Sequence, residues 1–291
     1  MNMNINIKIL MPFCRTKNAN LLKQSFANAV KGMRGTAELL PICSKREDAA
    51  LFDSAFITPR PPRGWDICYW KLNWALYFLL GQNRNAPIGI LNDMARSLAV
   101  SHKADGLYSD DGYDGKGSFG AGTVDLKPEV EVAINLFSSQ PSAAGFDAAT
   151  FETNRKLLRQ EANTYVGFAN DDDCWEPELF HKLEEAASGC QGSPKILITS
   201  MKWYRHEIRP DLLICKYTAA PSAMKPHGSG VRQYYVPASI MRGETFPNIN
   251  ISDGLFIEQL FQRRPADFLF LPELYVNWNG LPDARPDGWK F

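Results

Sequence analysis

The sequence predicts an α/β fold in which a mixed, mostly parallel sheet is flanked by helices on both faces. Apolar segments of strand length alternate with segments whose apolar residues recur at helical spacing, both near the start of the chain and after residue 145. Strands that alternate with helices favour parallel pairing, because each helix carries the chain back across the sheet. The 291 residues, 45% of them hydrophobic, suffice for one large core, and no linker or internal repeat divides them. We therefore expect a single large domain.

The first part of the chain supplies the opening strands and helices. The segment 5–13 is apolar and contains a proline near its end, which is typical of a buried strand. Leu21, Leu22, Phe26 and Ala29 have helical spacing. The predicted elements are strands at 5–13, 37–43 and 54–58 and helices at 18–33, 44–52 and 65–82.

Residues 83–145 interrupt this alternation. A glycine- and aspartate-rich run at 109–122 indicates an insertion that contains a mobile loop. After it, Pro177 is expected in the first turn of a helix, where its missing N–H costs nothing. The later predicted elements are helices at 146–162, 177–187 and 253–263 and strands at 164–170, 195–204, 231–241 and 267–276.

Composition disfavours several classes of protein. Lysine plus arginine equals aspartate plus glutamate, 32 each, so no net charge draws the chain toward nucleic acid or an anionic membrane. Apolar runs such as 75–80 are too short to span a bilayer, and the N-terminus lacks the pattern of a secretory signal. The six cysteines are dispersed without a CxxC pair, which favours free thiols and a cytoplasmic location.

Three consecutive acids, Asp171–Asp173, follow the predicted strand 164–170 in the sequence YVGFANDDDCWEPELF. Ligands of open α/β sheets bind beyond the carboxyl ends of the strands. Three adjacent carboxylates repel one another unless a positive charge lies beside them, and their oxygens suit Mg²⁺ or Mn²⁺. The alternative is a charged turn or an acidic N-terminus of the next helix. The run alone leaves both interpretations open.

The surrounding segment 154–183, NRKLLRQEANTYVGFANDDDCWEPELFHKL, resembles the central part of GT-A-fold glycosyltransferases, especially the inverting family 2. In that family a helix with Asn and Arg near its start leads into a strand that ends in a DxD-type motif. The resemblance assigns Asp172 and Asp173 to the metal. It assigns Arg155, Asn170, which replaces the usual first aspartate, and Asp171 to the nucleotide-sugar.

Two further segments match the same family in the same order. Segment 8–30, KILMPFCRTKNANLLKQSFANAV, resembles its opening strand and helix, and 236–261, VPASIMRGETFPNINISDGLFIEQLF, resembles its acceptor-side segment. The first match implies a nucleotide site that contains Pro12, Phe13, Cys14 and Arg15, with Asp48 of CSKRED as the second-strand acid. The second implies that Asp253 is the general base, although Ser252–Asp253 also reads as a helix cap. Acceptor contacts are expected from Trp175, His227 and Arg242, while a solvated loop histidine is the simpler reading of His227.

Two other groups of residues are open to functional and structural readings. Some of the seven tryptophans are expected to stack on sugar, while most pack in the core. Lys71 and Asn73 lie two apart on the helix 65–82 and do not face each other, so surface solvation is the default for both and one of them could reach the nucleotide.

The resemblance implies a GT-A-like domain over 1–291, with a nucleotide-binding half at about 1–175 and an acceptor-binding half at about 176–291. The expected activity is metal-dependent, inverting hexosyl or pentosyl transfer from a nucleotide-sugar. The acceptor is a glycan, a lipid-linked sugar, a protein or a modified nucleic acid. One alternative is a sugar-phosphate nucleotidyltransferase, which the absence of glycine from MPFCRTKNAN disfavours. The other is a non-catalytic carbohydrate- or partner-binding module, which Asn170 and CSKRED keep open.

Overall fold

The structure is a computed structural model. It describes residues 4–43, 45–58, 67–80, 163–190, 193–204, 213–226, 228–241, 244, 246 and 252–281. The predicted insertion at 83–145 and the predicted helix 146–162 lie outside these ranges, as do Arg155, His227 and Arg242.

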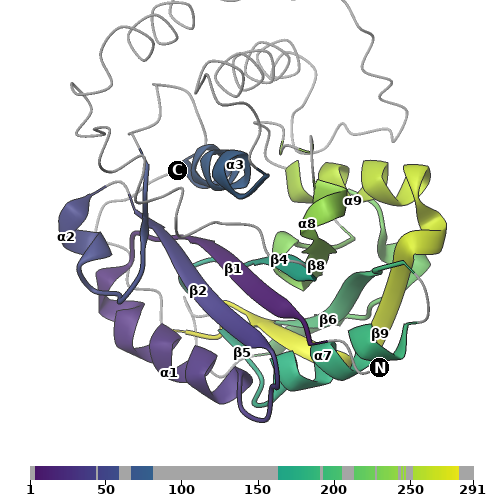
Figure 1. Cartoon of the computed structure of the whole chain (residues 1–291), viewed down its shortest axis with the longest axis horizontal. Coiled ribbons are helices and arrows are strands. Elements are labelled where there is room, and N and C mark those ends of the chain that lie inside the picture. Colours follow the sequence, from purple (N-terminus) through teal and green to yellow (C-terminus); the bar gives the residue numbers. More distant parts are fainter. Residues whose placement is uncertain are drawn as a thin grey trace, which may run out of the picture.

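One nine-stranded sheet organises the described chain, in the order β3-β2-β1-β4-β8-β6-β9-β5, with β7 paired to β6 (Figure 1). Its strands are β1 (Asn6–Pro12), β2 (Thr36–Cys43), β3 (Phe56–Ile57), β4 (Thr164–Phe168), β5 (Cys174–Trp175), β6 (Ile196–Tyr204), β7 (Leu213–Tyr217), β8 (Tyr234–Pro237) and β9 (Phe268–Trp278). β1 to β4, β6 and β9 run in one direction, and β5, β7 and β8 run in the other. This confirms the predicted α/β class with a mixed, mostly parallel sheet.

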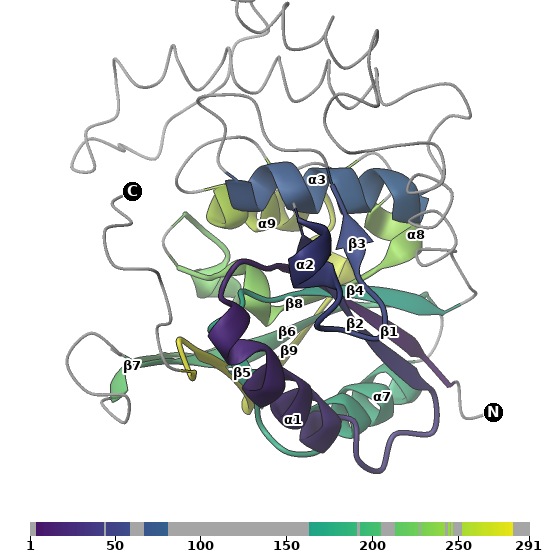
Figure 2. The ribbon, with the colours of Figure 1, turned by 90° about the vertical axis from the view of Figure 1, so that its left-hand side faces the viewer.

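Helices cover both faces of the sheet, as predicted (Figures 1 and 2). On one face α1 and α7 bury Leu22, Leu183 and their neighbours against the strands, and on the other α3, α8 and α9 bury Leu76, Met241 and Ile257. The helices are α1 (Ala19–Ala29), α2 (Arg46–Ala49), α3 (Ile67–Leu80), α7 (Leu179–Gly189), α8 (Ala238–Met241) and α9 (Ser252–Arg263). Short 3₁₀ turns lie at η1 (Thr16–Asn18), η3 (Pro221–Ala223), η4 (Val231–Gln233) and η5 (Pro265–Asp267).

Hydrophobic pattern explains the central strands. β1 lies between β2 and β4, and every residue after Asn6 is buried. A strand covered on both faces needs an almost continuous apolar run, which IKILMP supplies apart from Lys8. The Lys8 ammonium pairs with Glu38 of the neighbouring strand at 2.7 Å, which compensates its burial.

Several local predictions differ from the structure, and two strands were not predicted. Pro177 precedes α7 rather than opening it, because Glu178 adopts φ 60°, a left-handed conformation that cannot continue a helix. The predicted strand 231–241 divides into η4, β8 and α8. The strands β5 and β7 were not predicted, because two residues show no alternation and LICKY lies on an edge with little burial.

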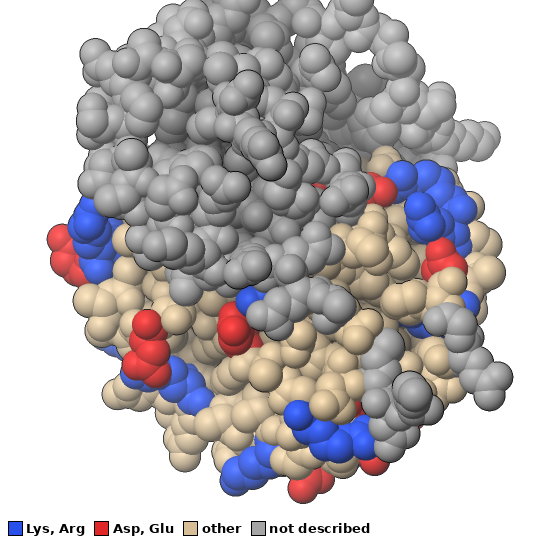
Figure 3. Space-filling view, in the orientation of Figure 1, with Lys and Arg blue, Asp and Glu red and all other residues tan. Residues whose placement is uncertain are grey.

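The sheet also joins the two predicted halves. β8, from the predicted acceptor-binding half, pairs antiparallel with β4 of the predicted nucleotide-binding half. Among the described residues on the face shown in Figure 3, acidic and basic side chains are interspersed and form no large patch of one sign. No helix in the described residues has both the length and the apolar character to cross a membrane.

Candidate functional site

The three acids form a turn between β4 and β5, which we call the acidic turn (Asp171–Asp173). The Asp173 N–H donates to the Asn170 carbonyl at 3.1 Å, closing the turn directly beyond β4. All three acids are buried, with exposed fractions of 2%, 7% and 2% in chain order. Each carboxylate therefore needs an identifiable partner, because an unpaired buried charge is strongly unfavourable.

Asp171 holds the loop that follows β1. Its Oδ2 accepts the backbone N–H groups of Cys14 at 2.6 Å and Arg15 at 2.7 Å, and its Oδ1 accepts the Arg15 guanidinium. The Asn18 amide donates to the Asp171 carbonyl at 2.9 Å. Both oxygens of Asp171 are thus engaged within the protein. This carboxylate fixes the predicted nucleotide loop, which is a different role from the nucleotide contact that the resemblance implies.

Asp173 joins three further segments. Its Oδ2 accepts Arg232 Nε at 2.9 Å and the Asn170 N–H at 2.7 Å, and its Oδ1 accepts the Asn279 N–H at 3.2 Å. Asn279 lies just beyond β9 with φ 53°, a conformation that asparagine tolerates better than most residues. The site residue Asp173 is therefore also engaged, on both oxygens.

The chain beyond β9 packs very closely against the acidic turn. The Leu281 N–H donates to the Asp172 carbonyl at 2.8 Å. A Cβ at Gly280 would lie 2.2 Å from Cys174 Sγ, so only glycine allows this approach. Gly280 thereby permits the hydrogen bonds that hold the acidic turn in place.

Asp172 differs from its two neighbours. Its Oδ2 lies 3.2 Å from an Arg15 guanidinium nitrogen, while its Oδ1 is buried and has no hydrogen-bond partner within the described part of the chain. Burial and the adjacent Asp173 raise the pKa of Asp172 to about 7, against the lowering effect of Arg15. Of the three acids, Asp172 alone has a carboxylate oxygen that accepts no hydrogen bond from the described residues.

Two arginines supply the positive charge that the sequence predicts beside the acidic turn. Arg15 pairs with Asp171 and Asp172, and Arg232 pairs with Asp173. Burial alone would lower the pKa of Arg232, but Asp173, Asp253 and Asp172 outweigh it and raise that pKa. The same balance, with Asp171 as the strongest carboxylate, raises the pKa of Arg15. Repulsion among the acids therefore does not by itself demand a metal ion, and the predicted cation stays a prediction.

The predicted base, Asp253, belongs to the same cluster. It lies in the first turn of α9, partly exposed, and its Oδ2 accepts the Val231 N–H at 3.1 Å. Its Oδ1 accepts the Gly254 N–H at 2.9 Å. Because Val231 directly precedes Arg232, the structure brings Asp253 close to the arginine that neutralises Asp173. Arg232 is a site residue that sequence reasoning missed, since nothing in GVRQYY distinguishes it from a surface arginine.

The predicted nucleotide loop is only partly available for contacts. Phe13 is fully buried and packs edge-on against Phe52 at 4.8 Å, and Pro12 ends the buried strand β1. Cys14 is exposed and Arg15 partly so. Side-chain contacts with a ligand can thus come from Cys14 and Arg15, while Pro12 and Phe13 shape the backbone.

The expectation of surface solvation for Lys71 and Asn73 is wrong. They are 2% and 1% exposed, and the helix that carries them, α3, lies over one face of the sheet (Figure 2). Lys71 Nζ donates to the Phe13 carbonyl at 2.8 Å, and the Asn73 amide exchanges two 2.8 Å hydrogen bonds with the Phe246 backbone. Lys71 thus places a third positive charge beside the predicted nucleotide loop. The sequence contained a signal for this burial, because a lysine in an almost wholly apolar helix must lie against apolar neighbours.

Two other predicted site residues, Trp175 and Asp48, have different surroundings. Trp175 is 5% exposed and packs against Phe26 and Phe180, so the acceptor role predicted for it finds no support in its position. Asp48 lies on α2, partly exposed, close enough to Cys43 to raise the pKa of that thiol, although burial is the larger cause.

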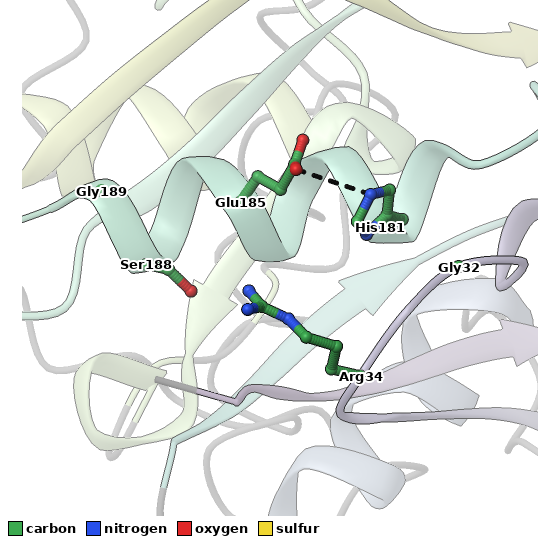
Figure 4. Close-up of a pocket in the computed structure, with 6 residues that line it drawn as sticks. All are labelled: Gly32, Arg34, His181, Glu185, Ser188 and Gly189. Carbon is green, nitrogen blue, oxygen red and sulfur yellow. Dashed lines mark ion pairs between the residues drawn. The ribbon is translucent and has the colours of Figure 1, made fainter. Parts of the chain in front are cut away.

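A surface cavity of about 420 Å³ lies at the opposite, amino-terminal end of the strands (Figure 4). An ion pair between His181 and Glu185 at 3.5 Å crosses its helical wall, and Arg34 faces that wall from the turn before β2. The cavity contains no residue that the sequence assigned to a site. It is lined by Gly32, Arg34, His181, Glu185, Ser188 and Gly189.

Comparison of the chain with protein-family models and with curated proteins finds no match.

Proposed function

We propose that the protein is a metal-dependent glycosyltransferase with a GT-A-like fold, which transfers a sugar from a nucleotide-sugar to an acceptor hydroxyl with inversion. Four features support the proposal. The acidic turn follows a central parallel strand, the loop after β1 is fastened to it, Asp253 lies in the same cluster, and one buried carboxylate oxygen of the turn has no partner among the described residues. Binding at the carboxyl ends of strands is the rule for open α/β sheets.

The unpartnered Asp172 Oδ1 carries the proposal. A buried carboxylate oxygen that lacks a donor is costly, so its persistence indicates a ligand that supplies positive charge or a hydrogen bond. The described residues contain no group of three or more His, Cys, Asp or Glu side chains arranged around a metal. Mg²⁺ and Mn²⁺ need no such cage, because they bind through one or two carboxylates together with substrate phosphates. The residues present therefore fit a cation shared with a diphosphate.

Charge around the acidic turn favours the same ligand. Three carboxylates face Arg15 and Arg232, so the turn carries one negative charge when all three acids are ionised, and Lys71 lies behind the neighbouring loop. A divalent ion would reverse this balance and make the site attractive to a diphosphate. Bound there, the ion would supply electrostatic stabilisation to the departing nucleoside diphosphate.

The chain's own residues take the remaining roles. Asp171 fixes the loop of Cys14 and Arg15 on the donor side, and Arg15 presents a guanidinium to the phosphates. Asp253, held by the Val231 and Gly254 N–H groups, accepts the proton of the acceptor hydroxyl as that oxygen attacks the anomeric carbon. Arg232 is a positioning residue that keeps Asp173 and its turn in place.

A thermal-shift screen of nucleoside diphosphates with and without Mn²⁺ tests the donor site. We expect one nucleotide to raise the melting temperature only with the metal, because ligands that bind the folded state stabilise it. Asp172→Asn should abolish the metal dependence. Asp267→Asn, which removes the charge of an aspartate at the opposite end of the strand set, is the matched control and should preserve it.

Nucleotide-sugar hydrolysis without acceptor then separates an enzyme from a binding module. Asp253→Asn should bind nucleotide and metal like the wild type but lose transfer to the acceptor. A wild-type protein that responds to no nucleoside diphosphate in the presence of Mn²⁺ or Mg²⁺ would refute the proposal.

A further inference from the structure

Two partly exposed tryptophans stack at the carboxyl ends of β6 and β9. Trp203 and Trp278 occupy paired positions on these parallel strands, with ring centroids 4.8 Å apart and planes at 18°. The Arg232 guanidinium carbon lies 4.6 Å from the Trp278 ring centroid. The Trp278 ring is therefore in contact with an indole and with a cation, which fixes the orientation of the pair.

Trp203 has a different environment on its other side. Its partner across the β6–β7 ladder is Cys215, and directly paired residues on neighbouring strands project from the same face. Cys215 is small and partly exposed. Trp203 itself is partly exposed, so among the described residues a small thiol and one stacked indole are its cross-strand partners and part of the side chain stays accessible.

This tryptophan pair borders the acidic turn directly. Arg232 contacts Trp278 and also donates to Asp173, and Asn279, the residue after Trp278, donates its N–H to the same carboxylate. Asp253, at the start of α9, also helps to raise the pKa of Arg232. The predicted nucleotide loop lies on β1, on the other side of the acidic turn and nearer the β3 edge of the sheet. The tryptophan pair is thus on the acceptor side of the proposed reaction centre.

We propose that Trp203, supported by Trp278, is the stacking platform for a sugar ring of the acceptor, so that the acceptor is a carbohydrate or carries one. This inference rests on the proposed function for its orientation relative to the donor. A flat indole face matches the C–H face of a pyranose and leaves the hydroxyl groups at the edge of the sugar ring uncovered. The buried Arg232–Asp173 pair holds the platform at a fixed place beside the acidic turn, which limits the cost of ordering it on binding.

Glycan binding by the whole protein, without donor, tests the platform. A printed glycan array identifies the sugars that bind, and titration of the best one with detection of the tryptophan indole N–H signals by NMR gives affinity and location. We expect Trp203→Ala to weaken binding about tenfold, which corresponds to about 1.4 kcal/mol, and Trp203→Phe to restore most of it, because a phenyl ring still offers an aromatic face. Tyr204→Ala, which removes the next aromatic residue on β6, is the matched control and should bind like the wild type.

The outcomes separate the platform from the donor site. Absence of glycan binding, or equal binding by Trp203→Ala and the wild type, overturns the platform even if nucleoside diphosphates still stabilise the protein. Loss of the nucleotide response in Trp203→Ala, with glycan binding intact, also overturns it, since the ring would then serve the donor. Glycan binding that depends on Trp203 in a protein that ignores every nucleotide keeps the platform and refutes the proposed transferase.

Discussion

Two buried carboxylates at opposite ends of the same strands differ in how completely they are hydrogen-bonded. Glu184 of α7 is fully buried at the amino-terminal end, and its two oxygens accept the backbone N–H groups of Arg34 at 2.8 Å and Gly35 at 2.7 Å. Asp172, at the carboxyl-terminal end, is almost as buried, but its Oδ1 has no partner among the described residues. Backbone groups of the described chain thus provide hydrogen bonds to both oxygens of Glu184 but leave one oxygen of Asp172 without a partner.

The contrast shows that burial of an acid does not identify a site. Glu184 ties α7 to the turn before β2, where a Cβ at Gly35 would lie 1.9 Å from the Ile5 carbonyl oxygen. Its hydrogen bonds are complete, so stability explains its position. The incomplete hydrogen bonding of Asp172, next to Asp253 and two arginines, is what indicates a ligand.

The largest expected effect is at the acidic turn. Arg232→Ala should lower the free energy of unfolding by about 3–5 kcal/mol, because it leaves the buried Asp173 without its counter-charge. Urea denaturation measures this. Arg263→Ala, which breaks an exposed ion pair with Glu244, should cost no more than about 1 kcal/mol. Similar losses in the two variants would show that the Arg232–Asp173 pair is not the constraint we describe.

Removal of the fully hydrogen-bonded carboxylate of Glu184 should cause the second-largest loss of stability. Glu184→Ala leaves the backbone N–H groups of Arg34 and Gly35 without their acceptor and empties a buried position, so we expect a loss of about 2–4 kcal/mol by the same measurement. Mn²⁺ and nucleotide binding should be unchanged once the variant is folded, because Glu184 lies at the other end of the strands. Altered metal binding would contradict our interpretation that Glu184 serves stability and Asp172 serves a ligand.

Unlike the two previous substitutions, Asp172→Asn should increase the free energy of unfolding at alkaline pH. A pKa raised to about 7 from the ordinary 3.8 means that the folded state holds this proton more firmly than the unfolded state does. The stability contributed by that proton is complete below about pH 4 and is lost as the pH rises through about 7. The variant does not titrate there, so at pH 8 it should be more stable than the wild type by about 1–3 kcal/mol, and near pH 4 the difference should vanish.

Urea denaturation at both pH values, without divalent ions, checks this prediction. Addition of Mn²⁺ and nucleoside diphosphate at pH 8 should stabilise the wild type and not the variant. A wild-type protein that is the more stable of the two at pH 8 would indicate that Asp172 is already satisfied.

We expect the smallest change in the free energy of unfolding for a substitution at Glu185, the residue after Glu184. Glu185→Gln removes an ion pair with His181 on the exposed wall of the surface cavity, where the Glu185 side chain is 61% exposed. We expect a change below about 0.5 kcal/mol in urea denaturation. The contrast with Glu184 would then depend on burial and hydrogen bonding alone, and a loss as large as that of Glu184→Ala would contradict it.

The sequence by itself determined the alternation of strands and helices and the position of the acidic turn, because both are local patterns of apolar and charged residues. The helices α3 and α9 and the strands β2, β6 and β9 lie close to their predicted ranges. The two-residue strand β5 and the edge strand β7 had no comparable local signal.

Only the tertiary structure decided which acid stays incomplete, which tryptophans are exposed and which positive charges are near. Asp171 and Arg15 are 156 positions apart, and Asp173 and Arg232 are 59 apart. Local sequence patterns place charges along the chain, but the cost of burying each one depends on partners that folding brings from distant segments. For that reason the run of three aspartates predicted a positively charged neighbour, and the packing of β1, η4 and β9 determined that two arginines fill most of that role.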